Sequence, residues 1–187
     1  MRRVLLLALA LAGGAVAGGH TGMDHGGYSG HITPPDAPVR SMTHLKALKG
    51  RAFDVAWTGA MIVHHDMAIQ MAKSELNAGR DARVRAAARG VISAQRREID
   101  LMNAWRRTWG AGVIPGGAAS MVGPKRGESW DHWFLTGMIP HHEGAVAMAR
   151  LVPARTQTAE VRKLAAQIVA DQTREIGEYR AWLKVVR

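Results

Sequence analysis

Apolar residues recur at helical spacing along four stretches of the chain, and no stretch alternates apolar and polar residues over a useful strand length. The pattern predicts four helices, at about 51–78, 81–109, 128–152 and from about 158 to the C-terminus. Gly79, Gly110 and Pro153 stand where the first three helices should end. Asp81 is a good N-cap for the second helix, and Thr158 holds the corresponding place before the fourth.

The second half of this pattern repeats the first at an offset of 77 residues. Met-Ile-Val-His-His-Asp at 61–66 returns as Met-Ile-Pro-His-His-Glu at 138–143, and Gln-x-x-Glu-Ile at 95–99 returns at 172–176. A repeat of this length is a complete supersecondary unit, here a pair of helices. The units 51–109 and 128–186, joined by the Gly/Pro-rich linker 110–127, therefore predict an all-α four-helix bundle made of two tandem helix–turn–helix repeats.

The first 17 residues have the features of a secretion signal. Two arginines precede an apolar run, and Ala15-Val16-Ala17 forms a small-x-small cleavage pattern. The apolar run is too short to span a bilayer, and no later segment is long and apolar enough to anchor the chain. We therefore expect export to a periplasm or cell envelope without stable membrane insertion. Residues 18–50, rich in Gly, His and Pro at their start, are expected to form a flexible arm and lead-in to the bundle.

Composition removes several classes of function. The chain has no cysteine, so it can have no disulfide, no thiolate metal ligand and no cysteine nucleophile. Its formal charge is +10, with arginines concentrated on the predicted helix 81–109, which fits either a patch for an anionic partner or an ordinary solvated face. Export and the lack of any recognisable motif argue against a nucleic-acid partner. No Ser/His/Asp set or phosphate-binding loop can be identified, so we predict no catalytic residue.

Each repeat places four polar residues on its own apolar stripe. These residues are Asp54, His64, Gln95 and Glu98 in the first unit, and Asp131, His141, Gln172 and Glu175 in the second. A buried polar group without a partner costs about 1–3 kcal/mol, so the set needs an explanation. One interpretation is a hydrogen-bond network that fixes helix register, with His64 against Glu98 and His141 against Glu175. The other is a metal site, because imidazoles and carboxylates on facing helices hold metals in bundles.

Sulfur donors and the N-terminal arm favour copper within the second interpretation. Four methionines lie at helical spacing near the histidines, namely Met61, Met71, Met138 and Met148. Methionine is a routine core filler, but beside histidine its thioether selects Cu(I). If cleavage follows Ala17, the mature chain begins Gly18-Gly19-His20, whose amine, two amide nitrogens and imidazole suit square-planar Cu(II) or Ni(II). A plain linker is the alternative for this segment.

The motif Met-Ile-x-His-His-(Asp/Glu)-x-Ala-x-x-Met-Ala, followed by Gln-x-x-Glu-Ile and a Trp, resembles the domain of unknown function 305 family over residues 53–183. The resemblance implies a ferritin-like four-helix bundle, export, and a link to copper binding and tolerance. It points to His64, His65, His141 and His142 as ligands, with the four methionines as soft ligands. The second unit departs from strict repetition where Gly144 replaces Met67 and Tyr179 replaces Met102.

The leading hypothesis is an exported copper-binding protein that buffers or hands on metal in the envelope. Glu98, Glu175 and His20 complete its candidate ligands, and self-association stays open because ferritin-like bundles often associate. A structural envelope protein with a buried His-Glu network is the first alternative. A di-iron oxidase is a weaker one, because the Glu-x-x-His motif that such a centre needs on two helices is absent.

Overall fold

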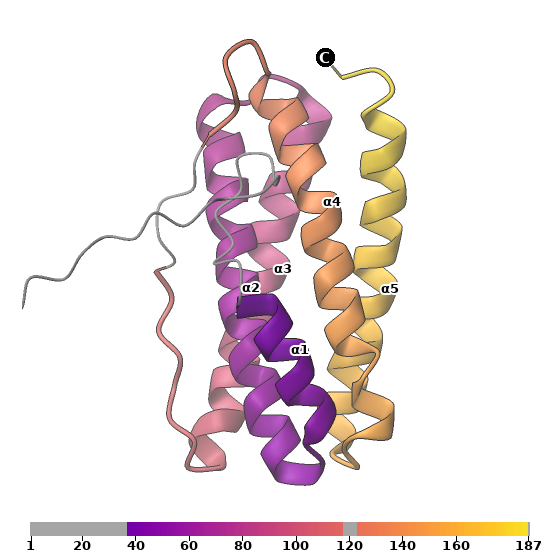
Figure 1. The fold of residues 1–187 in the computed structure, drawn as a ribbon. Coiled ribbons are helices and arrows are strands. Elements are labelled where there is room, and N and C mark those ends of the chain that lie inside the picture. The colour runs from indigo at the N-terminus through magenta and orange to yellow at the C-terminus, as the bar shows by residue number, and fades with distance from the viewer. Residues whose placement is uncertain (1–36, 118–122, 187) are drawn as a thin grey trace, which may run out of the picture.

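The computed structural model describes residues 37–117 and 123–186, and these residues form an all-α bundle (Figure 1). Its α-helices are α1 (Ala37–Ala47), α2 (Gly50–Ala78), α3 (Ala82–Thr108), α4 (Trp130–Ala149) and α5 (Ala159–Trp182), with a 3-10 turn at Val152–Ala154. α2 packs against α3 and α4 packs against α5, so each repeat forms one helical hairpin. The two hairpins meet mainly along α2 and α4. The predicted fold class is confirmed, while the expected signal at 1–17 and His20 in the arm lie outside the described residues.

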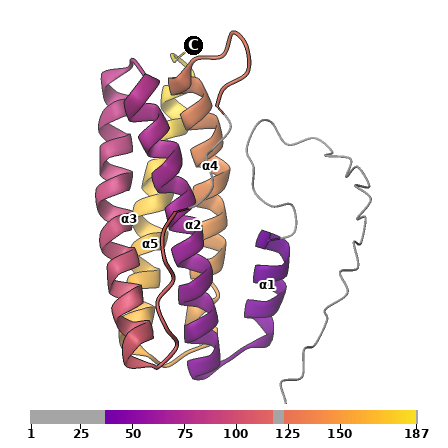
Figure 2. The same cartoon turned by 90° about the vertical axis from the view of Figure 1, so that its left-hand side faces the viewer.

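Helix α1 corrects the expectation that the whole of 18–50 is a flexible lead-in. Figure 2 shows it as a short helix at the outside of the bundle, beside α2. Leu45 is buried in the same apolar cluster as Phe53 and Trp57 of α2, and Met42 packs at the edge of that cluster. An 11-residue helix is too short to be stable alone, so packing holds it in place. That dependence on tertiary contacts is why its short apolar pattern predicted no helix.

The helix ends follow their capping residues with two differences. Asp81 caps α3 as predicted, since its carboxylate accepts from the backbone N–H groups of Arg83 and Val84. Thr158 stands at the N-cap position of α5, but its side chain does not cap the helix. Its hydroxyl donates instead to Asp54 Oδ2 on α2, at 2.6 Å. Helix α4 ends at Ala149, earlier than predicted, because the chain tightens into the 3-10 turn that contains Pro153.

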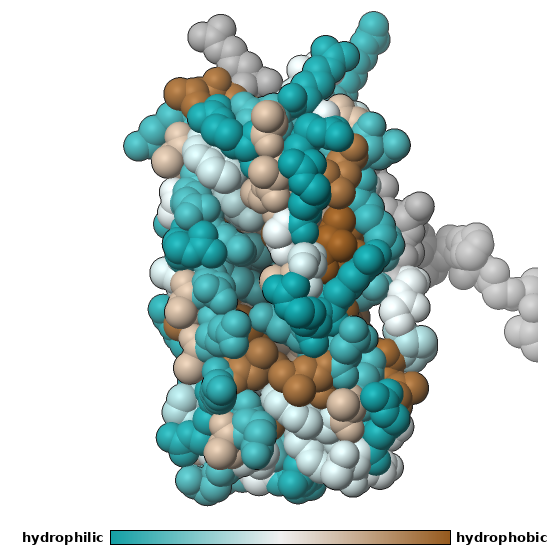
Figure 3. Space-filling model, turned by 180° about the vertical axis from the view of Figure 1, so that it is seen from behind, coloured by the Kyte–Doolittle hydropathy of each residue, from teal (hydrophilic) through white to brown (hydrophobic). Residues whose placement is uncertain are grey.

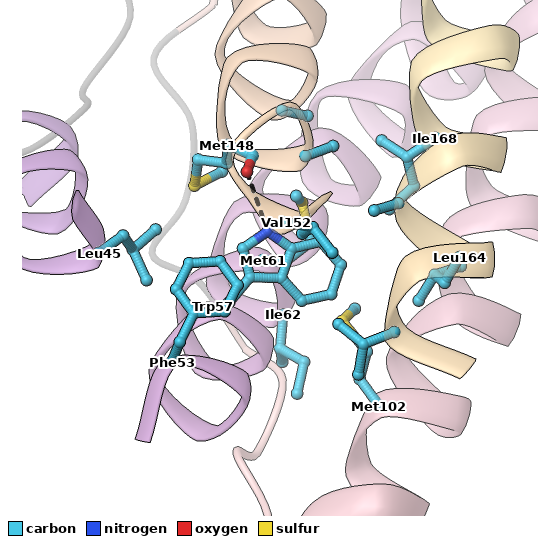
Figure 4. Close-up of a cluster of buried hydrophobic side chains, with 14 residues drawn as sticks. Leu45, Phe53, Trp57, Met61, Ile62, Met102, Met148, Val152, Leu164 and Ile168 are labelled. Carbon is cyan, nitrogen blue, oxygen red and sulfur yellow. Dashed lines mark hydrogen bonds between the residues drawn. The ribbon is translucent and has the colours of Figure 1, made fainter. Parts of the chain in front are cut away.

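The apolar core is divided along α2 by the His64-His65 pair. A first cluster gathers around Trp57, whose indole Nε1 donates to the backbone oxygen of Met148 at 3.2 Å (Figure 4). A second cluster toward the C-terminal end of α2 includes Met71 together with Phe134 and Met138 of α4. The histidines therefore lie in the stretch of the bundle between two apolar cores.

The rear face of the bundle is mainly polar, with apolar side chains in separate patches (Figure 3). In the described part of the chain, no helix combines the length and the hydrophobicity needed to cross a membrane.

Candidate metal centre

The histidine pairs of α2 and α4 approach each other through the first histidine of each pair. The rings of His64 and His141 lie with their centroids 3.8 Å apart, tilted by 44°. His65 and His142 are completely buried, whereas His64 and His141 are half-buried. Adjacent residues on a helix point about 100° apart, so each pair sends one ring into the core and one toward the facing helix.

The histidine that pairs with glutamate is the second of each pair, so the predicted pairing of His64 with Glu98 and of His141 with Glu175 is wrong. His65 Nε2 lies 2.6 Å from Glu98 Oε2, and His142 Nε2 lies 2.8 Å from Glu175 Oε2. The prediction assumed a narrow two-position seam. A helix inside a four-helix bundle buries a wider stripe, which on α2 includes Thr58, His65 and Ala72.

Each glutamate fixes the proton on its histidine. In the neutral ring, Nε2–H donates to the carboxylate and the lone pair stays on Nδ1. The Nδ1 atoms of His65 and His142 are both buried without a hydrogen-bond partner. Histidines that bind metals commonly donate their other ring N–H to a carboxylate in this way. Glu98 and Glu175 therefore fit the role of orienting partners, with Nδ1 as the available ligand atom.

His64 is held neutral by its surroundings. Burial is the main cause that lowers the pKa of its imidazole to about 3, and positive charge on His65 and His142 contributes to the same shift. Its Nδ1 is also buried without a hydrogen-bond partner. On the other side of the ring, a Cβ placed on Gly144 would lie 3.1 Å from Nε2. A neutral imidazole keeps one nitrogen lone pair that can act as a metal ligand.

Two amides add to the buried acceptors. Gln95 and Gln172 are 3 % and 4 % exposed, and the Oε1 atom of each lacks a hydrogen-bond partner. Each lies one helical turn before the glutamate of its own repeat. Lone pairs left without donors cost free energy when buried, and a bound cation would satisfy them. The residues present therefore fit a metal ion in chemical character.

The other predicted ligands have different surroundings. Met61 and Met148 are buried in the first apolar cluster, and Met71 and Met138 in the second. The acidic residues that follow the histidine pairs make surface links. Asp66 Oδ2 accepts from the Gly117 N–H at 2.9 Å, and Glu143 Oε1 pairs with Arg180 Nη2 at 2.5 Å.

The glutamate that holds His65 reaches a groove on the surface of the bundle. Glu98 lies in a groove of about 200 Å³ between α3 and α5, which Leu101, Leu164 and Asp171 also line. Its side chain is 13 % exposed. Within the described residues, no three His, Asp or Glu side chains already gather in metal-binding geometry. The structure therefore supplies potential ligands singly or in pairs. These side chains would have to move closer together to coordinate a metal ion.

Comparison with known proteins places the chain in a family. The family described as "Domain of unknown function (DUF305)" matches residues 11–106 and 130–187. The chain belongs to the DUF305 family. The resemblance inferred from the duplicated His-His motif is thereby confirmed.

Solved structures of similar proteins share the fold. CopM in its Cu(I)-bound form is 30 % identical, with a TM-score of 0.62 over 70 % of this chain and 95 % of that one. CopM has also been solved in Cu(II)-bound, Ag-bound and apo forms. A DUF305 fragment from Deinococcus radiodurans is 28 % identical, with a TM-score of 0.61 over 73 % of this chain and 98 % of that one.

A shorter match joins the chain to an uncharacterized protein of Acanthamoeba polyphaga mimivirus. The two are 40 % identical over 48 residues, which is 26 % of this chain and 32 % of the viral protein. The chain thus matches about a third of the length of that curated relative.

Proposed function

We propose that this DUF305 protein is exported and binds copper, and that it buffers the metal or hands it on in the cell envelope. The observation that carries the proposal is the contact between the His64 and His141 rings, which brings the histidine pairs of the two repeats together. His65 and His142 each have Nε2 held by a glutamate and a buried Nδ1 without a partner. The existence of copper-bound and silver-bound forms of CopM, a protein of the same fold, supports copper over other ions.

The ligands in this proposal are His64, His65, His141 and His142, with Glu98 and Glu175 as orienting partners. Soft thioethers would favour Cu(I), and the absence of cysteine leaves methionine as the sulfur donor. Export is supported by the signal-like sequence at 1–17. A terminal Gly-Gly-His20 chelate for Cu(II) remains a separate part of the proposal.

Copper titration of the processed protein tests the proposal, with its N-terminus determined by mass spectrometry and with oxidising and reducing conditions compared. One variant changes His64, His65, His141 and His142 to Ala, and a second lacks residues 18–38. His132→Ala serves as the matched control, because His132 lies on α4 and pairs with Glu128 away from the four rings.

We expect tight stoichiometric binding that the four-histidine variant loses while it keeps its helicity and that the control retains. Loss of binding only on removal of 18–38 would instead make the arm the binder and the bundle its scaffold. Absence of copper binding in every form would contradict the proposal and leave the His-Glu pairs as structural elements.

A further inference from the structure

The two repeats differ within the α2–α4 interface, where Met67 in the first repeat stands at the position of Gly144 in the second. On α2 the interface stripe contains Ala60, His64, Met67 and Met71, and on α4 it contains Gly137, His141, Gly144 and Met148. Both stripes follow the helical spacing i, i+4, i+7, i+11, which brings their residues to one face. The residue at 67 or 144 therefore lies one turn beyond the first histidine of its own repeat.

Position 144 faces the histidine of the other repeat. A Cβ at Gly144 would lie 3.1 Å from His64 Nε2, closer than most real Cβ contacts. The backbone of α4 at Gly144 therefore lies directly against the His64 ring. A larger residue there would have to share space with the imidazole.

An approximate twofold axis relates the two repeats. The contact between position 144 and His64 should therefore have a counterpart in the first repeat. The His-Glu distances of the two repeats are 2.6 and 2.8 Å, and the equivalent residues His64 and His141 touch each other. Equivalent residues can meet in this way when the twofold axis passes between them. Under that relation, position 67 faces the His141 ring as position 144 faces the His64 ring.

The residue at position 67 is a methionine whose environment differs from that of the others. Among the methionines in the described part of the chain, Met67 alone belongs to neither apolar cluster, and its side chain is half-buried. Packing in a core therefore accounts for the remaining methionines but not for this one.

We propose that Met67 supplies a thioether ligand beside His64 and His141, and that Gly144 leaves the opposite side of the ring pair without a second thioether. The duplicated motif then forms one asymmetric site for a soft monovalent cation, Cu(I) or Ag(I). This inference rests on the proposed copper function and deepens it by naming a ligand and the preferred charge state.

Cu(I) competition titration of the processed protein under reducing conditions tests the ligand, using Met67→Leu and, as matched control, Met102→Leu. Met102 is a methionine of α3 buried in the first apolar cluster, and it is not among the candidate ligands. We expect Met67→Leu to weaken Cu(I) binding at least about tenfold and the control to leave it nearly unchanged. In a second readout, NMR of protein labelled with ¹³C at the methionine methyl groups should show the Met67 resonance shifting when one equivalent of Ag(I) is added.

Unchanged Cu(I) affinity in Met67→Leu, with an unmoved Met67 resonance, would overturn the assignment. A His64→Ala/His141→Ala variant separates this failure from failure of the proposed function. If that variant loses binding while Met67→Leu keeps it, only the thioether ligand is wrong. Binding that survives in the histidine variant would overturn the thioether ligand and the assignment of His64 and His141 as ligands. Thermal unfolding of each variant confirms that it is folded.

Discussion

The Thr158 hydroxyl donates a 2.6 Å hydrogen bond to Asp54 Oδ2, which links residues 104 positions apart in the chain. Asp54 lies near the start of α2 in the first repeat, and Thr158 precedes α5 in the second. The equivalent Asp131 on α4 accepts from the backbone N–H groups of Arg80 and Asp81 at 3.0 and 2.7 Å. The first helix of each repeat is thus tied to the start of the second helix of the other repeat.

The first prediction is that Thr158→Val destabilises the bundle by about 1–3 kcal/mol, because the buried Asp54 carboxylate loses its hydroxyl donor. Arg51, whose Nη1 lies 3.6 Å from Asp54 Oδ2, is too far away to replace that bond. Urea denaturation followed by circular dichroism measures the change. Thr108→Val is the control, because that hydroxyl bonds only its own helix at an exposed site. Equal stability of the two variants would mean that the hydrogen bond between Thr158 and Asp54 does not stabilise the bundle.

A second prediction concerns Arg106, a buried cation that holds the start of the linker against α2. Its guanidinium donates to the backbone oxygens of Val55, Ala111 and Gly112 at 2.5, 3.1 and 3.0 Å. A lysine ammonium has no planar fork to reach all three, so Arg106→Lys should cost about 2 kcal/mol or more. The same denaturation experiment applies, with the exposed Arg107→Lys as control. Matching midpoints for the two variants would contradict this role.

How far the sequence predicts the structure depends on which signals are local. Helix positions and the fold could be predicted from the apolar periodicity and the 77-residue repeat, because both signals are present in the sequence itself. The His-Glu pairing depends instead on how wide a stripe each helix buries, which is set by its neighbours. His65 and His142 hold equivalent positions, so the repeat reproduced one error in both units. The space that Gly144 leaves beside His64 also depends on the facing helix, so no pattern in one repeat reveals it.

The third prediction tests whether glutamate orients the ligand histidine. Glu98→Gln replaces the carboxylate that accepts from His65 Nε2–H with an amide that can also donate, so the ring is free to turn or change tautomer. If the proposed function is right, copper affinity should fall about 10- to 100-fold. Competition titration measures this change, and Glu175→Gln should behave alike because the second repeat has the same pair. Glu178→Gln is the control, since that exposed residue pairs with Arg174. Unchanged affinity in both Glu98→Gln and Glu175→Gln would show that the carboxylates do not set the ligand state.

The fourth prediction concerns a buried carboxyl group at the end of α2. Glu75 is 0 % exposed, and a Cβ on Gly79 would overlap its Oε1 atom, so glycine is required beside it. Burial and the negative charge of Asp131 raise the pKa of Glu75 to about 8. At neutral pH the group is therefore largely protonated, and an uncharged side chain is what this site accommodates.

The pH dependence follows from that shift. In the unfolded chain the pKa of Glu75 is about 4.5, so between pH 4.5 and 8 the folded state holds a proton that the unfolded state has released. Stability should therefore fall as pH rises through this window, by up to about 1.4 kcal/mol per pH unit from this group, and level off above it. Glu75→Gln is neutral at every pH and removes this contribution.

Urea denaturation of both proteins at several pH values between 5 and 8 measures the difference in the free energy of unfolding. The free energy of unfolding of Glu75→Gln should rise relative to that of the native protein as pH increases. Other groups, including His64, affect both proteins alike and cancel in that difference. Exposed Glu160→Gln should give a curve parallel to that of the native protein. A parallel curve for Glu75→Gln as well would mean that Glu75 titrates normally and would contradict the prediction.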